Sequence, residues 1–406
     1  MPSTSSAFGF QSVSSIVDGA AGALPAGPAY GFGLYVHWPY CTRICPYCDF
    51  NVYAAKDRDN GALVQALRDD LARHARWLPE HPELGSIYFG GGTPSLMAAA
   101  DLATLLEDAE KLFGIETGAE ITLEANPNDV LSADLEGWAA AGINRLSIGI
   151  QSLDEAALTF LGRDHDVSSA REAVARAGRL FPNHSIDLIY ARPGQSPAEW
   201  ETELSEALAL GAPHLSLYEL TIAERTAFGK RAGRGELVPM PDDDQADLYE
   251  LTQQVADAHG LPAYEVSNHA RSADVQSRHN LTYWRGGDWI GLGPGAHGRL
   301  TIGGQRIATH AALKPADYQA AVSREIEPEG ETLSPIGNAR ELLALGLRPA
   351  EGFDPARIEA LTGTPLLNDA LETFVEQGLV LREATRIALT PEGRLLADRI
   401  AAELSP

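Results

Sequence analysis

The segment LYVHWPYCTRICPYC, residues 34–48, contains every cysteine of the chain, namely Cys41, Cys45 and Cys48. It begins as a β-rich run and continues into a loop that carries the thiols. Three closely spaced cysteines make a poor disulfide framework, so we interpret them as metal ligands. The spacing CxxxCxxC can wrap three thiolates around one [4Fe-4S] cluster and leave the fourth iron without a protein ligand. The alternative is a zinc site, which needs a fourth ligand such as His37 or Asp49.

Around this segment, from Gly33 to about Leu220, short β-rich runs alternate with amphipathic helical stretches, which predicts a parallel sheet. Because βα crossovers are right-handed, six such units predict an α/β fold, a partial (β/α)6 barrel with its site at the carboxyl ends of the strands. The predicted strands are residues 33–38, 86–89, 121–124, 145–150, 185–189 and 214–218.

The sequence divides into four parts. Residues 1–30 are small and polar and predict a disordered lead-in, and residues 31–228 form the barrel core. Residues 229–333 predict a linker and a dense polar and aromatic region, in which Gly303 and Gly304 favour a tight hairpin. Residues 334–406 predict a smaller α+β domain of three helices and a strand pair at 379–389, in an order like that of a winged helix.

The charge and hydropathy of the chain narrow its partners and location. A formal charge of −25 disfavours nucleic acid, because binding to phosphates rests largely on Lys and Arg. The first 30 residues lack the pattern of a secretory signal, and no apolar run approaches the roughly 20 residues of a bilayer span. We therefore expect a cytoplasmic protein without a transmembrane segment, peripheral at the inner membrane only through protein partners.

Several residues near the carboxyl ends of predicted strands are candidates for cofactor binding. The run GGGTP, residues 90–94, follows the second strand, where backbone without side chains lets a cofactor approach, although an ordinary turn is the alternative. Glu124 and Gln151 end two strands, and Asp187 lies in another. Each alone can be a structural hydrogen-bonding residue, but together they favour a cofactor rim.

These motifs resemble those of the radical S-adenosylmethionine (SAM) superfamily, whose members bind SAM at the open iron. The resemblance narrows to the oxygen-independent coproporphyrinogen oxidases and the related heme chaperones of the HemW group. It spans the chain from Tyr30 and is carried by LYVHWPYC (34–41), YFGGGTP (88–94), NRLSIGIQ (144–151), LGR (161–163) and DLIY (187–190). The implied SAM positions are Tyr35, Gly91, Gly92, Thr93, Glu124, Gln151, Arg163 and Asp187. A second SAM at Gln151, Arg163 and Asp187 stays open.

Two features separate the groups within this family. The oxidases resemble one another in a fourth cysteine two residues after the third, where this chain has Phe50. The HemW group carries HNxxYW, which matches His279, Asn280, Tyr283 and Trp284. This match implies a heme region in which His279 can supply an imidazole and the aromatic residues an apolar surface. The alternatives are a buried aromatic cluster with a hydrogen-bonded histidine, or heme ligation by His37, His269 or His297.

The resemblance implies a heme chaperone that carries a [4Fe-4S] cluster and SAM and transfers heme to respiratory membrane proteins. The alternative is an oxygen-independent coproporphyrinogen III oxidase, a radical SAM enzyme of porphyrin biosynthesis that oxidatively decarboxylates two propionates. An RNA-modifying enzyme is disfavoured by the acidic charge. Whether SAM is cleaved in the native task, the identity of the heme recipients and the oligomeric state stay open.

Overall fold

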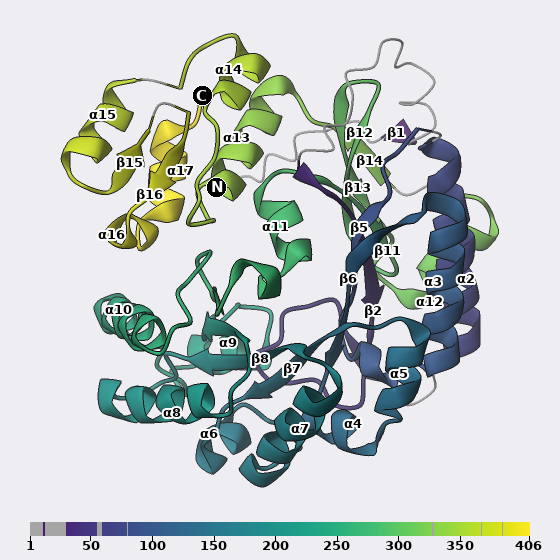
Figure 1. Ribbon diagram of the computed structural model, residues 1–406, viewed down its shortest axis with the longest axis horizontal. Coiled ribbons are helices and arrows are strands. Elements are labelled where there is room, and N and C mark those ends of the chain that lie inside the picture. The colour runs from purple at the N-terminus through teal and green to yellow at the C-terminus, as the bar shows by residue number, and fades with distance from the viewer. Residues whose placement is uncertain are drawn as a thin grey trace.

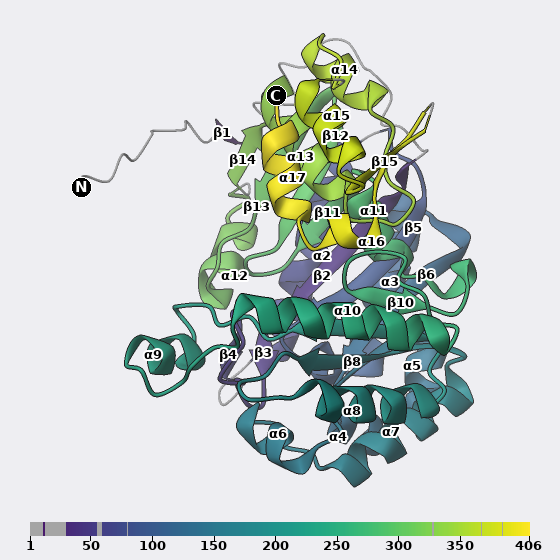
Figure 2. The same ribbon diagram turned by 90° about the vertical axis from the view of Figure 1, so that its left-hand side faces the viewer.

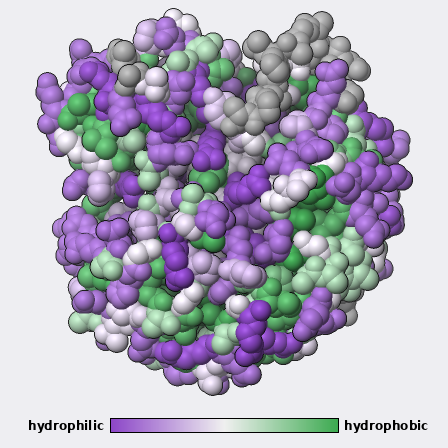
Figure 3. Space-filling view, in the orientation of Figure 1, coloured by the Kyte–Doolittle hydropathy of each residue, from purple (hydrophilic) through white to green (hydrophobic). Residues whose placement is uncertain are grey.

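The computed structural model describes residues 11–12, 30–54, 59–78, 80–326, 329–366, 368–383 and 385–406. The expected lead-in at residues 1–30 therefore falls largely outside the described residues. One curved sheet of 12 strands runs through the molecule, with helices on its outer side (Figure 1). The face in view is largely hydrophilic, broken by apolar patches (Figure 3). Among the described residues, no helix is both long enough and apolar enough to cross a bilayer.

Six neighbouring parallel strands form the centre of the sheet and confirm the predicted α/β barrel. They are β2 (Phe32–Trp38), β5 (Leu84–Gly91), β6 (Ile115–Ala125), β7 (Arg145–Gln151), β8 (Asn183–Tyr190) and β9 (His214–Glu219). Each coincides with a predicted strand. Their residues are buried nearly throughout, as expected for parallel strands covered by helices on one face and enclosing a barrel interior on the other.

The outer layer consists mainly of the helices that connect these strands (Figure 1). They are α2 (Asn60–Trp77), α3 (Ala99–Phe113), α4 (Pro127–Ser132), α5 (Leu135–Ala141), α6 (Glu155–Phe160), α7 (Val167–Leu180) and α8 (Pro197–Ala209). Leu63, Leu67 and Leu71 of α2 are all 0% exposed, because a spacing of four residues keeps them on one face of the helix. That face packs on the sheet and holds the barrel strands in register for the site.

The segment 229–333, which the sequence interpretation set apart from the barrel, extends the barrel's own sheet at both edges. Helices α9 (Ala227–Gly233) and α10 (Asp242–Ala258) precede β10 (Asn268–Ala270), which pairs antiparallel with β9. At the other edge, β11 (Asp288–Leu292) lies parallel to β2. Pairing between strands so far apart in the sequence leaves no local signal, so this extension was not predicted.

Beyond β11 the sheet continues through antiparallel strands. These are β12 (His297–Ile302), β13 (Gln305–His310), β14 (Glu329–Thr332) and β1 (Gln11–Ser12), with α12 (Pro315–Ser323) between β13 and β14. The predicted hairpin at Gly303 and Gly304 is confirmed, since both residues have positive φ and connect β12 to β13.

The C-terminal unit has its own hydrophobic core and sits against one end of the barrel (Figure 2). It contains α13 (Pro335–Gly346), α14 (Ala356–Thr362), α15 (Asp369–Glu376), α16 (Pro391–Arg394), α17 (Ala397–Leu404) and the strands β15 (Val380–Arg382) and β16 (Ile387–Leu389). The predicted strand pair is confirmed, but the expectation of three helices was wrong. Four of the five helices have eight residues or fewer, which is too short for an apolar period to define them.

Candidate functional site

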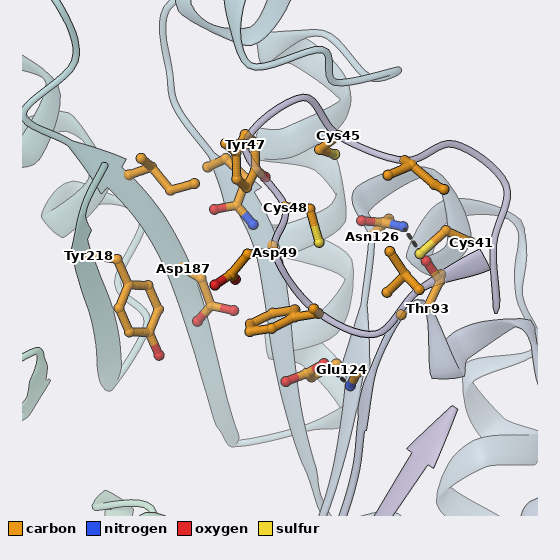
Figure 4. Close-up of a pocket in the computed structure, with 18 of the residues that line it drawn as sticks. Cys41, Cys45, Tyr47, Cys48, Asp49, Thr93, Glu124, Asn126, Asp187 and Tyr218 are labelled. Carbon is orange, nitrogen blue, oxygen red and sulfur yellow. Dashed lines mark hydrogen bonds between the residues drawn. The ribbon is translucent and has the colours of Figure 1, made fainter. Parts of the chain in front are cut away.

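The carboxyl ends of the central strands open into a cavity of about 370 Å³. All the predicted SAM positions except Tyr35 line it, together with the three cysteines. Figure 4 shows Cys41, Cys45 and Cys48 on the loop at one side of the cavity and Glu124 and Asp187 on strands at another. The topology therefore brings together residues that are distributed over about 150 positions of sequence, as the carboxyl-end rule for such barrels requires.

The cysteines lie between two short strands, β3 (Tyr40–Cys41) and β4 (Tyr53–Ala54). Cys48 N donates to Cys45 O at 3.1 Å, which folds the loop into a turn. Burial raises the pKa of the Cys41 thiol, and it raises the pKa of the Cys48 thiol to about 11. A positive charge is therefore needed to hold these two sulfurs as thiolates at neutral pH.

The donors considered for a single zinc ion do not form one group in this structure. Among the described residues, no three His, Cys, Asp or Glu side chains converge on one metal ion. His37 is engaged on both ring nitrogens, 3.0 Å from Tyr35 OH and 3.0 Å from Asn51 O.

The glycine run ties β5 to the cysteine-bearing strand. Gly92 N donates to Trp38 O at 2.7 Å and Thr93 N donates to Tyr40 O at 2.9 Å. A Cβ at Gly92 would lie 2.8 Å from Tyr40 O and 2.9 Å from Trp38 O, both backbone atoms. The close approach of the neighbouring chain thus requires glycine at this position. The approach of a cofactor stays a prediction.

Two partly buried carboxylates, those of Glu124 and Asp187, line the cavity. Glu124 accepts hydrogen bonds from Tyr88 OH at 2.8 Å and from Gly91 N at 3.1 Å. Burial, reinforced by Asp187, raises the pKa of Glu124 to about 7 although the Tyr88 and Gly91 hydrogen bonds oppose the shift. Burial also raises the pKa of Asp187, whose two oxygens each accept from Ser147 Oγ at 3.0 Å. These acceptors suit the hydroxyl or amino groups of a polar cofactor.

Arg163 connects the cysteine loop to the strands. Its Nη1 donates to Cys45 Sγ at 3.3 Å, and its Nη2 donates to Gly149 O at 2.9 Å and to Asn126 Oδ1. Gln151, at the end of β7, has φ of +63°, a left-handed conformation that costs a non-glycine residue about 1–3 kcal/mol and that clusters at functional sites.

The HNxxYW motif forms most of helix α11 (Arg278–Trp284), which lies against the start of β5 and β2 inside the barrel. His279 is 1% exposed, with Nδ1 2.9 Å from Ser86 Oγ and Nε2 2.6 Å from Tyr283 OH. Its ring stacks on Tyr88, with the ring centroids 5.1 Å apart. Both ring nitrogens are therefore occupied, and burial lowers the pKa of His279 to about 3, which keeps the ring neutral.

Through Tyr88, the motif contacts the residues that line the cavity. Tyr88 joins His279, on which it stacks, to Glu124, to which it donates. Tyr35 lies in the same layer, with its ring centroid 6.3 Å from those of Tyr88 and His279. Sequence reasoning missed Tyr88, although strand alternation places it on the same face of β5 as Gly90, within the glycine run.

Of the other residues of the motif, Asn280 takes part in the cap of the helix and Trp284 contacts the C-terminal unit. Asn280 N donates to Ser277 Oγ and so caps α11. The guanidinium of Arg348 lies 5.4 Å from the centroid of the Trp284 ring. Of the other histidines considered for heme, His269 is fully buried in β10 and His297 is exposed at the start of β12.

Comparison with known proteins gives consistent results over most of the chain. Residues 35–207 match the Radical SAM superfamily, and residues 333–396 match the HemN C-terminal domain. Radical S-adenosyl methionine domain-containing protein 1, mitochondrial, from Danio rerio is 38% identical, over 79% of this chain and 73% of the relative. Heme chaperone HemW is 35% identical in Haemophilus influenzae and 34% in Escherichia coli, in each case over 90% of this chain and 96% of the relative.

A solved structure gives the same fold. Coproporphyrinogen III oxidase (HemN) from Escherichia coli, described as a radical SAM enzyme, superposes with a TM-score of 0.76. The match covers 92% of this chain and 90% of that one at 21% sequence identity. At that identity the likeness establishes the fold, including the strand extension and the C-terminal unit that sequence patterns alone left incomplete.

Proposed function

The chain belongs to the radical SAM superfamily, in the branch that includes the heme chaperone HemW, and from this premise we propose that it binds heme and transfers it to respiratory membrane proteins. The observation that carries the proposal is the similarity to HemW, which runs through nearly all of both chains. For Escherichia coli, the identity is 34% to HemW and 21% to the HemN whose fold it shares. Phe50 at the oxidases' fourth cysteine position and the HNxxYW motif agree with this assignment.

The proposed resident cofactors are a [4Fe-4S] cluster on Cys41, Cys45 and Cys48, and SAM in the adjoining cavity. When bound, such a cluster supplies an open iron position for SAM and an electron for its reductive cleavage. In support, the three cysteines and the proposed SAM positions other than Tyr35 line one cavity. Arg163 donates a hydrogen bond to Cys45 Sγ, and the glycine run holds the strand that ends at Cys41.

The proposed SAM site runs along Gly91, Gly92 and Thr93 to Glu124, with Asp187 and Gln151 farther along the rim. Glu124 supplies an acceptor oxygen to a cofactor hydroxyl or amino group, and a donor from the cofactor favours its ionised form. Tyr88 and the His279 ring beneath it fix the direction in which that carboxylate points. We therefore assign the HNxxYW motif a supporting role for the SAM site, besides any contribution it makes to heme.

Replacing Glu124 with glutamine tests this site. The amide keeps the shape but loses the negative charge, so SAM affinity is expected to fall by about 10- to 100-fold, the scale of a charge-assisted hydrogen bond. Calorimetric titration of the reconstituted protein measures it. Glu219→Gln is the matched control, because Glu219 lines the same cavity outside the proposed SAM positions. Equal losses in both variants would contradict the specific role of Glu124.

The alternative function, oxygen-independent coproporphyrinogen III oxidation, uses the same fold and cofactors and is distinguished by its reaction. We expect the reconstituted protein, supplied with SAM, a reductant and coproporphyrinogen III, to release no carbon dioxide from the propionates. Steady decarboxylation at a catalytic rate would replace the chaperone proposal with the oxidase.

A further inference from the structure

A heme carrier needs an axial ligand for iron, and histidine is a common one. The chain has 11 histidines. Most are buried in the described structure, where no porphyrin can reach them without rearrangement: His37, His74, His165, His184, His214, His269 and His279. In His37, His214 and His279, moreover, both ring nitrogens are already within hydrogen-bond distance of a partner.

The remaining histidines are His81, His259, His297 and His310, and two of them form a pair. His297 in β12 lies directly opposite His310 in β13. Their rings are stacked, with centroids 4.2 Å apart and an interplanar angle of 14°. His297 is exposed, and its ring forms no hydrogen bond within the described part of the chain. Nε2 of His310 is buried and also lacks a partner there.

The pair stands beside the cysteine loop. Asn51, which follows that loop, donates from Nδ2 to Pro294 O and to Leu313 O, each at 2.8 Å. Pro294 is three residues before His297, and Leu313 is three residues after His310. The chain segments that flank both histidines are thus fixed to the segment that follows Cys48.

Apolar and cationic side chains are available on the same segments for the rest of a heme. Phe50 is 65% exposed and lines the mouth of the cavity, and Leu313 is 53% exposed. Large apolar side chains at such exposure leave apolar surface that binding can cover. Lys314 is exposed next to Leu313 and carries a charge opposite to that of a heme propionate.

We propose, on the premise of the heme-carrying function above, that His297 is the axial ligand of heme iron. The His310 ring stacks on the face of the His297 ring, and the porphyrin covers Phe50 and Leu313. This site places the heme next to the cluster cavity, outside the barrel interior that α11 fills. It also gives Phe50 a role at the position where the oxidases have their fourth cysteine.

The test is a heme titration of the full-length protein and of two single variants, followed by absorbance after gel filtration. His297→Ala is expected to weaken heme retention at least about tenfold and to shift the Soret band, since even the outer partners of metal ligands are worth about 10- to 100-fold in affinity. His259→Ala, at another exposed histidine, is the matched control and should bind as the wild type does.

A second measurement uses the wild-type protein, so that its result does not depend on whether the His297→Ala variant folds correctly. Ethoxyformylation of histidines, mapped by mass spectrometry, is expected to decrease at His297 when heme is added and to stay unchanged at His259.

The outcomes separate the two proposals. Heme retention with an unchanged Soret band in His297→Ala, or protection of His81 or His259 in place of His297, overturns the ligand assignment and leaves the heme-carrying function intact. If the wild-type protein retains no heme, both the ligand assignment and the heme-carrying function are overturned.

Discussion

Serine in place of Cys45 is expected to leave the anaerobically reconstituted protein without its [4Fe-4S] cluster. The chain has three cysteines in all, so no spare thiol can replace a lost one. A serine hydroxyl ionises far less readily than a thiol and is a poor ligand for iron. We expect iron to fall from about four per chain to well below one, with loss of the brown absorbance. The guanidinium of Arg163 beside Cys45 would then lack its sulfur partner.

The same result is expected for Cys41→Ser and Cys48→Ser, with Thr42→Ala as the control. Thr42 is exposed in the same loop, so its truncation should leave iron and sulfide content unchanged. Iron and sulfide analysis together with electron paramagnetic resonance of the reduced protein measures the outcome. Full clusters in all three serine variants would refute the assignment, and one zinc per chain in the wild type would favour the zinc site.

Alanine at Gly92 is expected to abolish most SAM binding and to disturb the cluster loop as well. The new Cβ would meet two carbonyl oxygens, those of Tyr40 and Trp38, at 2.8 and 2.9 Å. Backbone atoms cannot move aside as a flexible side chain can, so β5 and the strand leading to Cys41 must separate. Overpacking of this kind costs about 1–3 kcal/mol, which corresponds to about 5- to 150-fold in affinity if it falls on the binding site.

Gly233→Ala is the matched control, because a Cβ there meets no atom within 4 Å. Calorimetry with SAM on cluster-loaded protein, preceded by iron analysis, separates loss of cofactor affinity from loss of the cluster. Wild-type affinity and iron content in Gly92→Ala would show that the chains can separate at no cost and would contradict the role given to the glycine run.

The sequence predicted the parts of the fold that depend on local periodicity. Each of the six central strands was recognised because a short β-rich run alternates with a helix, and the carboxyl-end rule then placed Glu124 and Asp187 on one rim. The structure brings these carboxylates to the cysteines in one cavity. Their binding of SAM remains the proposal that Glu124→Gln tests.

Features that depend on contacts between distant segments were not predictable in this way. Strand β11 joins the edge of β2 more than 250 residues away, and nothing in its composition specifies that partner. Likewise, the stacked pair of His297 and His310 exists only because β12 and β13 align in one register. From the sequence, His297 was one of three alternative heme ligands, with His37 and His269, and His310 was not among them.

The HNxxYW motif was predicted to form a heme region, with a buried aromatic cluster and a hydrogen-bonded histidine as the alternative. In the structure His279 is buried, and both of its ring nitrogens lie within hydrogen-bond distance of a partner. Heme binding by this motif stays a prediction. Through its stacking on Tyr88, which donates to Glu124, the motif contacts a residue that lines the cavity.

Heme binding by this radical SAM protein underlies both the proposed function and the assignment of His297. The most direct test is titration of the purified full-length protein with heme, gel filtration to remove unbound heme, and measurement of the Soret absorbance per chain. We expect about one heme retained per chain, whether or not the cluster has been reconstituted, because His297 lies outside the cysteine set. If the folded protein elutes without heme and all the heme elutes as free ligand, the proposal that the protein carries heme is contradicted.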